Sequence, residues 1–201
     1  MSVKHELFET FDAAYDGIAP WDIDHPQQVY VELDQAGELR GSVLDVGCGT
    51  GENTLYFVLQ GHTDVWGVDF SPAGIKKAQG KAEALGVSVT FRVGDALALQ
   101  ELGRTFDTVT DCGLLHNFSD EERTLFVKSL TSVLKPGGTY FLHCFSEQFS
   151  DGVGPRGVSP EVISALFAEN WSINYIRATH FELSITRYQP PAWIASITYK
   201  G

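Results

Sequence analysis

Short apolar runs alternate along the chain with longer segments in which apolar residues recur every three or four positions. The runs are rich in β-branched and aromatic side chains, which is typical of buried β-strands. They cover residues 43–46, 65–70, 89–93, 106–111 and 139–145. Because strands and helices alternate, the pattern predicts an α/β fold in which a mostly parallel sheet is covered by helices on both faces.

The segment after the second run carries the signals of a helix start. Ser71 can cap the first turn, and Pro72 suits the first helical position. Four apolar residues then fall on one face of the predicted helix, at Ile75, Ala78, Ala82 and Leu85. We expect this face to be buried.

A second helix is predicted between the fourth and fifth runs. Ser119 and Glu122 have the spacing of a capping box. Apolar residues follow at helical spacing, at Phe126, Leu130, Val133 and Leu134. The Lys-Pro-Gly-Gly segment at residues 135–138 is expected to end this helix and to turn the chain into a strand that begins at residue 139.

The chain length suits one domain, residues 1–201, with a substantial core. No run approaches the roughly 18 apolar residues that cross a bilayer. The N-terminus, with His5 and Glu6, lacks the basic-then-apolar layout of a secretory signal. We therefore expect a cytoplasmic protein with no membrane partner.

Charge and cysteine usage argue against further classes. Asp and Glu number 26 against 14 Lys and Arg, and the net charge of -12 opposes binding to a phosphate backbone, so no nucleic-acid partner is expected. The widely spaced Cys48, Cys112 and Cys144 include no Cys-x-x-Cys pair. We expect them to be small buried residues rather than parts of a disulfide framework or a metal site.

The first predicted strand runs into a glycine-rich turn, with Gly47, Gly49 and Gly51 at alternate positions. Glycine lets the backbone turn sharply and approach a ligand closely, because it has no Cβ atom. Asp45 lies beside this turn, where a pyrophosphate site would avoid a negative charge. A nucleoside that bears an amino acid therefore fits better than a dinucleotide.

Acidic residues end or follow four successive predicted strands, at Asp45, Asp69, Asp95 and Asp111. Ligands of open α/β sheets bind at the carboxyl ends of the strands. One such acid can be a helix cap or a turn residue. Four together indicate a binding site, since buried unpaired acids are costly.

These residues resemble the motifs of the class I S-adenosylmethionine-dependent methyltransferases, and the resemblance covers roughly residues 40–200. It implies a single Rossmann-like sheet of seven strands in the order 3-2-1-4-5-7-6, whose last strand is antiparallel. Residues 171–184 and 192–199 would supply strands six and seven. It also implies S-adenosylmethionine as the cofactor, with Asp69 at the ribose, Asp95 and Ala96 at the adenine, and Asp111 near the methionyl end.

A narrower resemblance is to small bacterial enzymes related to thiopurine, thiol and halide methyltransferases and to methyltransferases of heterocyclic toxins. It rests on residues 19–22, 51–53, 111–116 and 118–120. It implies that residues 1–38 form an N-terminal helical lid over a core of residues 39–201, with Trp21 close to the methionyl group. Tyr15, Asp22 and His25 are further lid candidates. The alternative for Trp21 is a hydrophobic staple that holds the N-terminal helix on the body.

The cofactor roles follow from the side chains themselves. Asp69 can accept hydrogen bonds from both ribose hydroxyls, and Phe70 either packs on the adenine or belongs to the core. Asp95 either accepts from the adenine amino group or caps the next segment. Gly47 and Gly49 are expected to contact the cofactor through their backbone, with Asp45 acting indirectly. Asn53, like Thr54, either contacts the cofactor or caps the following helix.

A sulfonium methyl group is already activated, so catalysis needs mainly positioning and exclusion of water. His116, in the loop after the fourth strand, is best placed to act as a general base for a hydroxyl or ring N–H acceptor. Its alternative is an ordinary histidine at a helix entry. We assign catalysis to His116, Tyr15 and Trp21, and expect His143 to be structural. Further aromatic walls are predicted at Phe118, Phe145, Phe149 and Trp193, with a rim at residues 147–158.

The leading functional prediction is methyl transfer to N, S or O of a small aromatic or heterocyclic molecule. Alternatives are thiol or halide methylation, a cyclase that releases methylthioadenosine, and a nicotinamide-dependent oxidoreductase. The Gly-x-Gly-x-Gly spacing and Asp45 oppose the last of these. We expect a monomer or a weak homodimer.

Overall fold

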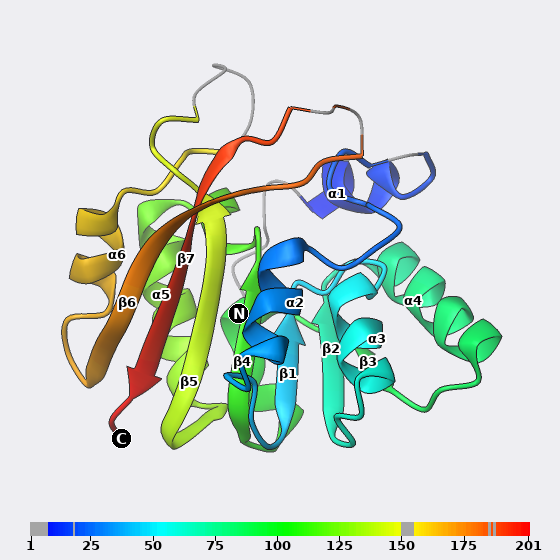
Figure 1. The fold of residues 1–201 in the computed structure, drawn as a ribbon, viewed down its shortest axis with the longest axis horizontal. Helices are drawn as coiled ribbons and strands as arrows, with labels where there is room; N and C mark the ends of the chain where they lie inside the picture. The colour runs from blue at the N-terminus through cyan, green and yellow to red at the C-terminus, as the bar shows by residue number, and fades with distance from the viewer. Residues whose placement is uncertain (1–7, 18, 150–154, 185, 187) are drawn as a thin grey trace.

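The computed structural model describes residues 8–17, 19–149, 155–184, 186 and 188–201 (Figure 1). Part of the rim predicted at residues 147–158, and the segment with His5 and Glu6, therefore lie outside the described residues. The strands are β1 (Val43–Val46), β2 (Val65–Asp69), β3 (Thr90–Val93), β4 (Phe106–Cys112), β5 (Leu134–Phe145), β6 (Trp171–His180) and β7 (Pro191–Tyr199). The helices are α1 (Phe8–Ala14), α2 (Gln28–Gln35), α3 (Glu52–Leu59), α4 (Pro72–Leu85), α5 (Asp120–Thr131) and α6 (Pro160–Leu166), with short 3-10 helices η1 (Ala96–Leu102) and η2 (Leu115–Asn117).

The sheet has seven strands in the order β3-β2-β1-β4-β5-β7-β6, which confirms the predicted order. Strands β1 to β5 are parallel, and β7 is antiparallel to both of its neighbours. The carboxyl ends of the five parallel strands therefore meet at one edge of the sheet. Helix α1 lies over that edge (Figure 1).

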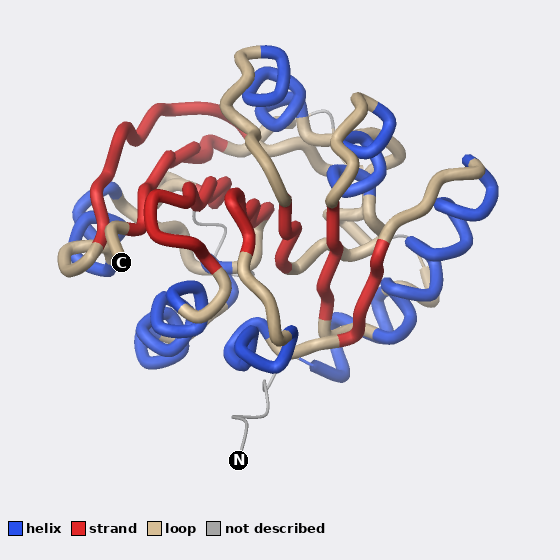
Figure 2. The backbone as a smooth tube through the Cα atoms, turned by 90° about the horizontal axis from the view of Figure 1, so that it is seen from below, coloured by secondary structure: helices blue, strands red, loops and turns tan. Residues whose placement is uncertain are grey.

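Helices cover both faces of the sheet, as Figure 2 shows end-on. On one face, α2 and α3 contribute Tyr30 and Phe57 to a core with Val43 and Phe141. On the other face, α5, η1 and α6 bury their apolar residues against β1, β4 and β5 in the largest core cluster. None of the helices in the described residues is both long enough and apolar enough to span a bilayer.

The predicted helix starts are confirmed. Ser71 caps α4 by accepting a hydrogen bond from the amide of Gly74 at 2.9 Å. Ser119 and Glu122 form both bonds of the capping box of α5. The predicted buried face of α4 is wrong at one position, because Leu85 is 50% exposed in the last turn, beyond the reach of the sheet.

The start of strand five also differs from its prediction. Helix α5 ends at Thr131, and β5 begins at Leu134 rather than residue 139. The Lys-Pro-Gly-Gly segment lies within this strand as an irregularity, where the pairing with β4 shifts between Phe106 and Thr108. Val133 and Leu134 are buried even though they follow the helix. Strand β6 ends at His180, four residues earlier than predicted, and the chain from 181 to 184 turns toward the site.

Candidate active site

The glycine turn joins β1 to α3 at the carboxyl edge of the sheet. Gly47, Gly49 and Gly51 have φ values of 71°, 53° and 86°, a left-handed backbone conformation that residues other than glycine rarely adopt. The amides of Gly47 and Cys48 donate to the carbonyl of Val68 at 2.7 and 3.1 Å, which anchors the turn to β2. The turn leaves Gly47 and Gly49 on the wall of a large cavity.

Asp69, the last residue of β2, also lines this cavity. Its carboxylate accepts hydrogen bonds from the amides of Gly49 at 2.8 Å and Ser71 at 2.9 Å. Burial raises the pKa of Asp69, and these two bonds oppose that shift. Each carboxylate oxygen has a further lone pair, so the group can still accept a hydrogen bond from a ligand. Phe70 follows on the same wall.

Asp45 and Asp111 lie beneath the cavity rather than on its wall. Asp45 accepts from the hydroxyls of Thr54 at 2.6 Å and Thr110 at 2.9 Å, and burial raises its pKa to about 6. Asp111 accepts from the Tyr140 hydroxyl at 2.7 Å, and burial raises its pKa to about 7.

The carboxylate of Asp111 also accepts from the amides of Leu114 at 2.8 Å and Leu115 at 3.2 Å. These bonds fix the loop that carries His116. The predicted position of Asp111 near the methionyl group is therefore not one of direct contact with the cavity. Its side chain acts on the backbone of the following loop.

Asp95 and Ala96 line a separate, small hollow together with Phe70 and Leu114. The carboxylate of Asp95 accepts from the amide of Leu97 at 2.8 Å, so it caps η1. Phe70 contacts both the hollow and the large cavity, which places its ring on a ligand wall.

Neither Asn53 nor Thr54 caps α3, because Gly51 holds the N-cap position without a side-chain bond. The side-chain oxygen of Asn53 accepts from the amide of Gln27 at 3.0 Å, and Asn53 lines the cavity. Thr54 is fully buried, and its hydroxyl donates to Asp45.

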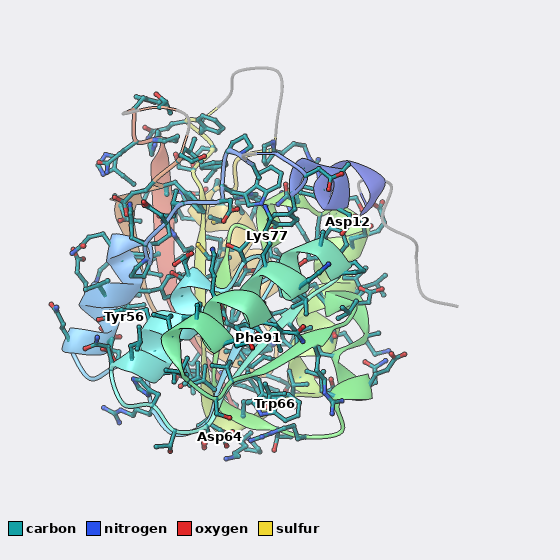
Figure 3. All side chains as sticks on the ribbon, turned by 90° about the vertical axis from the view of Figure 1, so that its right-hand side faces the viewer. Asp12, Tyr56, Asp64, Trp66, Lys77 and Phe91 are labelled. Carbon is teal, nitrogen blue, oxygen red and sulfur yellow. The ribbon has the colours of Figure 1, made fainter. Side chains whose placement is uncertain are left out.

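The N-terminal segment covers the glycine turn, and its helix α1, which carries Asp12, lies over the upper end of α4 (Figure 3). Asp12 of α1 accepts from the Ser71 hydroxyl at 2.5 Å and from the amide of Ala73 at 3.2 Å, which holds α1 on the start of α4. The indole N–H of Trp21 donates to the Tyr15 hydroxyl at 3.1 Å. A Cβ atom on Gly49 would lie 2.7 Å from that hydroxyl oxygen, so Tyr15 closes directly on the turn.

Further bonds tie the same segment to the body. Asp22 accepts from the Thr50 hydroxyl at 2.5 Å and lies 3.9 Å from the Lys81 ammonium group, which also pairs with Glu52. The predicted lid residues Tyr15, Trp21, Asp22 and His25 all line the cavity. Trp21 also contacts the ring of Phe11 at 5.0 Å, so it acts as both wall and staple.

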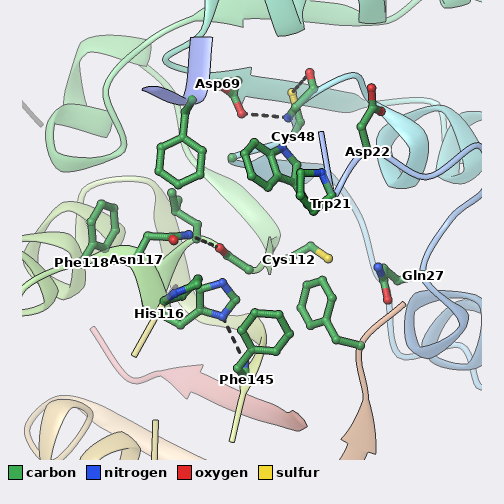
Figure 4. A pocket seen from close by; sticks show the side chains of 18 of the residues that line it. Trp21, Asp22, Gln27, Cys48, Asp69, Cys112, His116, Asn117, Phe118 and Phe145 are labelled. Carbon is green, nitrogen blue, oxygen red and sulfur yellow. Dashed lines mark hydrogen bonds between the residues drawn. The ribbon is translucent and has the colours of Figure 1, made fainter. Parts of the chain in front are cut away.

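The cavity has a volume of about 1210 Å³ and is bounded by the lid, the glycine turn, the loop after β4 and the chain after β6 (Figure 4). That volume exceeds the upper end of about 1,000 Å³ that is usual for a single ligand site. Beyond the glycine turn its wall is mostly apolar and aromatic, with Phe118, Phe145, Phe149, Phe181 and Leu183. Trp193 was predicted in this wall, but it is not part of the cavity lining and its indole N–H bonds to Glu147 at 3.0 Å.

His116 lies between this aromatic wall and the lid. Its Nδ1 accepts a hydrogen bond from the amide of Phe145 at 3.1 Å, and its ring stacks on the Phe145 ring at 4.5 Å. Burial lowers the pKa of His116 from 6.5 to about 3, with smaller contributions from His143 and Arg123. The imidazole is therefore neutral near pH 7, and its Nδ1 lone pair is already used.

His143 lies behind the wall, in β5. Its Nε2 lies 3.2 Å from the His180 carbonyl, its Nδ1 lies 3.8 Å from the Cys112 sulfur, and its ring stacks on Phe181 at 4.3 Å. Of the cysteines, Cys144 is buried as predicted, but Cys48 and Cys112 are half-buried and line the cavity. The prediction of burial is wrong for these two cysteines. Cys48 lies in the glycine turn after β1 and Cys112 ends β4, and both positions face the cavity.

The sequence patterns missed the residues that the chain after β6 brings to the cavity. Phe181 and Leu183 were assigned to a strand, yet they follow β6 and line the cavity. Gln27, also missed, exchanges two hydrogen bonds with the backbone of Glu182, at 2.8 and 3.0 Å. Composition gives no signal for contacts of this kind, because they join residues 155 positions apart.

Comparisons with known proteins agree with this geometry. Residues 43–138 match the family described as a methyltransferase domain. The chain is 32% identical over 185 residues to the 2-heptyl-1-hydroxyquinolin-4(1H)-one methyltransferase of Mycobacteroides abscessus, covering 87% of this chain and 81% of the relative. The chain belongs to the class I S-adenosylmethionine-dependent methyltransferases.

Solved structures of other proteins share the fold. A protein solved in work on the conversion of a disulfide bond into a thioacetal group during echinomycin biosynthesis has 32% identity and a TM-score of 0.87, with coverage of 96% and 93% of the two chains. A SAM-dependent methyltransferase from Anabaena variabilis has a TM-score of 0.78 at 19% identity, with coverage of 98% and 96%. This second likeness concerns the fold alone.

The cofactor of this methyltransferase is S-adenosylmethionine. The residues at the carboxyl edge of the sheet fit it, because the glycine turn offers backbone without a Cβ atom and Asp69 keeps acceptor capacity beside it. The volume of the cavity also leaves room for a second molecule beside the cofactor.

Proposed function

We propose that this methyltransferase transfers the methyl group to N, S or O of a small, flat aromatic or heterocyclic molecule by in-line displacement. The observation that carries the proposal is the aromatic part of the cavity, where Phe145, Phe149 and Phe181 stand beside the glycine turn. The centroid of the Phe145 ring lies 4.3 Å from that of Phe149 and 4.8 Å from that of Phe181, and flat apolar ligands stack on such rings. The hydroxyquinolinone named for the Mycobacteroides abscessus relative is a molecule of this class.

We assign cofactor binding to Gly47, Gly49 and Asp69. Phe70 and Ala96 would contact the adenine, and Asn53 would contact the cofactor from the other side of the cavity. Asp45, Asp95 and Asp111 act indirectly, because their hydrogen bonds hold α3, η1 and the loop after β4 beside the site. When bound, S-adenosylmethionine supplies a methyl group that its sulfonium already activates. Tyr15 and Trp21 cover the reacting end and exclude water, and the aromatic wall orients the acceptor toward it.

A direct test incubates the protein with S-adenosylmethionine and a panel of acceptors: 1-hydroxyquinolin-4(1H)-one, a heteroaryl thiol, an indole, an aliphatic thiol and iodide. Mass spectrometry should detect a methylated heterocycle together with S-adenosylhomocysteine. Binding of S-adenosylhomocysteine without methylation of any heterocycle would contradict the proposal. Methyl iodide or methylated aliphatic thiols as the only products would favour the thiol or halide alternative.

The remaining alternatives give different products. A cyclase would release methylthioadenosine in the absence of any acceptor. The methyltransferase family of the chain excludes the nicotinamide-dependent oxidoreductase. The aromatic cavity beside the turn favours neither, since cyclisation needs no acceptor site and a dinucleotide needs a phosphate site at the turn.

A further inference from the structure

The hydrogen bonds of His116 fix which of its ring nitrogens carries the proton. A neutral imidazole has one N–H donor and one acceptor nitrogen. Because the Phe145 amide donates to Nδ1 at 3.1 Å, Nδ1 is the acceptor and Nε2 carries the hydrogen (Figure 4).

The Nε2–H group faces the cavity. Within the described part of the chain, this N–H group has no hydrogen-bond partner. Every side-chain nitrogen or oxygen there that is shielded from solvent does have a partner, so Nε2 is not one of the shielded atoms. Nε2 must therefore reach the open space of the cavity that His116 lines. A Cβ atom on Gly113 would lie 3.4 Å from Nε2, so the absence of that atom keeps this edge of the ring open.

We propose that the site takes its acceptor as a preformed anion, with the Nε2–H of His116 donating a hydrogen bond to an acceptor oxygen that is conjugated with the accepting atom. This deepens the proposed function and rests on it. The acceptor class is then a weakly acidic N-hydroxy, hydroxy or mercapto heterocycle that also carries an oxygen substituent on the ring. His116 is a hydrogen-bond donor in this reaction and not the general base that the sequence predicted.

The chemical step balances without a base. The anionic heteroatom forms a bond to the methyl carbon, the carbon–sulfur bond breaks, and its electron pair stays on sulfur. One negative and one positive charge disappear, and both products are neutral at the reacting centres. No proton leaves the site during the transfer, so no residue has to accept one.

The surroundings of His116 keep it in the neutral form. Burial is the main reason that its pKa is lowered, and His143 of β5 and Arg123 of α5 add to the effect; Arg123 also donates to the Leu115 carbonyl at 3.3 Å. The other charged or titratable groups on the cavity wall are Asp22, His25, Cys48, Glu52, Asp69, Cys112, Asp120, Glu121, Glu122 and Arg156, together with Tyr15. Phe145 stacks on one face of the ring, and the tilted Phe181 ring lies 6.0 Å away between centroids.

The first experiment needs no variant. 1-Hydroxyquinolin-4(1H)-one and its ring-nitro and ring-methoxy derivatives differ in the acidity of the N-hydroxyl group. The inflection of kcat/KM against pH should move with the pKa of each acceptor. In the complex with S-adenosylhomocysteine, the absorption spectrum of each quinolone should be that of its anion at a pH below its pKa in water. An inflection at one fixed pH for all three, or binding of the neutral form, would overturn the inference.

Three substitutions then separate the possible roles of His116. His116→Gln places an amide N–H where Nε2 was, His116→Asn keeps only an acceptor for the Phe145 amide, and His116→Phe keeps neither. Donation to the acceptor predicts that kcat/KM falls about 10- to 100-fold in His116→Phe and His116→Asn and is largely restored in His116→Gln. The quinolone spectrum should follow the same order.

Other outcomes contradict the inference in identifiable ways. Rescue by His116→Asn alone would mean that the ring only supports the Phe145 amide. Equal losses of about 10²- to 10⁴-fold in all three, with binding of S-adenosylhomocysteine intact by calorimetry, would indicate a general base. If no quinolone is methylated by the wild-type protein while S-adenosylhomocysteine binds, the proposed function fails for this acceptor class and the inference fails with it.

Discussion

Buried ionisable side chains in this methyltransferase are held in specific protonation states by the groups around them. His116 and His143 are both buried, His116 with one edge on the cavity, and burial lowers the pKa of each to about 3. Asp45 and Asp111 lie in β1 and β4, and burial raises their pKa values to about 6 and 7. The two kinds of group therefore contribute to stability with opposite dependence on pH.

The contribution of His143 can be isolated by substitution. Its pKa is about 3 when folded and about 6.5 when unfolded, so the unfolded state binds more protons between these values. The stability from neutral His143 is complete above pH 6.5 and is lost as the pH falls toward 3. In His143→Gln, which cannot be protonated, the free energy of unfolding should fall less steeply with decreasing pH, by up to about 1.4 kcal/mol per pH unit.

Urea unfolding of wild-type protein and His143→Gln between pH 7 and about 4.5 measures this difference. Comparing the two proteins at each pH cancels the opposite contributions of Asp45 and Asp111, which are present in both. Parallel curves of the free energy of unfolding against pH would mean that His143 has the same pKa in the folded and unfolded protein. Glutamine preserves a donor toward the His180 carbonyl, so the substitution should be tolerated.

The positions of the four acidic residues were predicted correctly from the sequence, but their partners were not. Only Asp69 reaches the large cavity. Asp95 and Asp111 bond to amides within four residues, and Asp45 bonds to threonine hydroxyls from α3 and β4. A strand end provides unpaired amides as well as access to ligand, and the sequence pattern cannot show which of the two a carboxylate uses.

At the scale of elements, the glycine turn and the lid form one unit. Gly49 donates to Asp69 on one side and lies beneath the Tyr15 hydroxyl on the other. Elements with local signals, such as the capped helices α4 and α5, were predicted at their true starts. The start of β5 was not, because the pairing of Leu134 with Phe106 draws residues before the glycine pair into the sheet.

A pair of alanine substitutions tests the coupling of turn and lid. Gly49 and Gly37 both have positive φ values, 53° and 68°, but a Cβ atom would meet Tyr15 at Gly49 and nothing within 4 Å at Gly37. Each substitution should cost about 1–2 kcal/mol of stability from backbone strain. Only Gly49→Ala should also displace Tyr15 and weaken binding of S-adenosylhomocysteine, by at least tenfold in calorimetry. Equal affinities in the two variants would show that the lid does not depend on this contact.

At the scale of the whole molecule, two segments far apart in the sequence, residues 20–27 and 182–184, meet over the carboxyl edge of the sheet. Gln27 bonds to Glu182 in both directions, and the amide of Ser184 donates to the Pro20 carbonyl at 2.8 Å. The lid and the chain after β6 thus support each other, and Phe181 and Leu183 complete the acceptor wall from there. Periodicity reports local structure only, so these long-range contacts were beyond prediction from one sequence.

Gln27→Ala should reveal this mutual support. Gln27 is buried, and its loss leaves the amide and carbonyl of Glu182 without these partners, so the free energy of unfolding should fall by about 1–3 kcal/mol.

The acceptor wall should loosen more than the glycine turn, because Phe181 and Leu183 flank Glu182 while Asp69 and Gly49 do not. The KM for the methyl acceptor should therefore rise several-fold, with little change in the affinity for S-adenosylhomocysteine. The neighbouring Gln28→Ala is the matched control, since that side chain is exposed and, among the residues that the structure describes, bonds only to Glu32 at 3.3 Å. An unchanged acceptor KM in Gln27→Ala, or an equal change in both variants, would show that the chain after β6 is held in place without the lid.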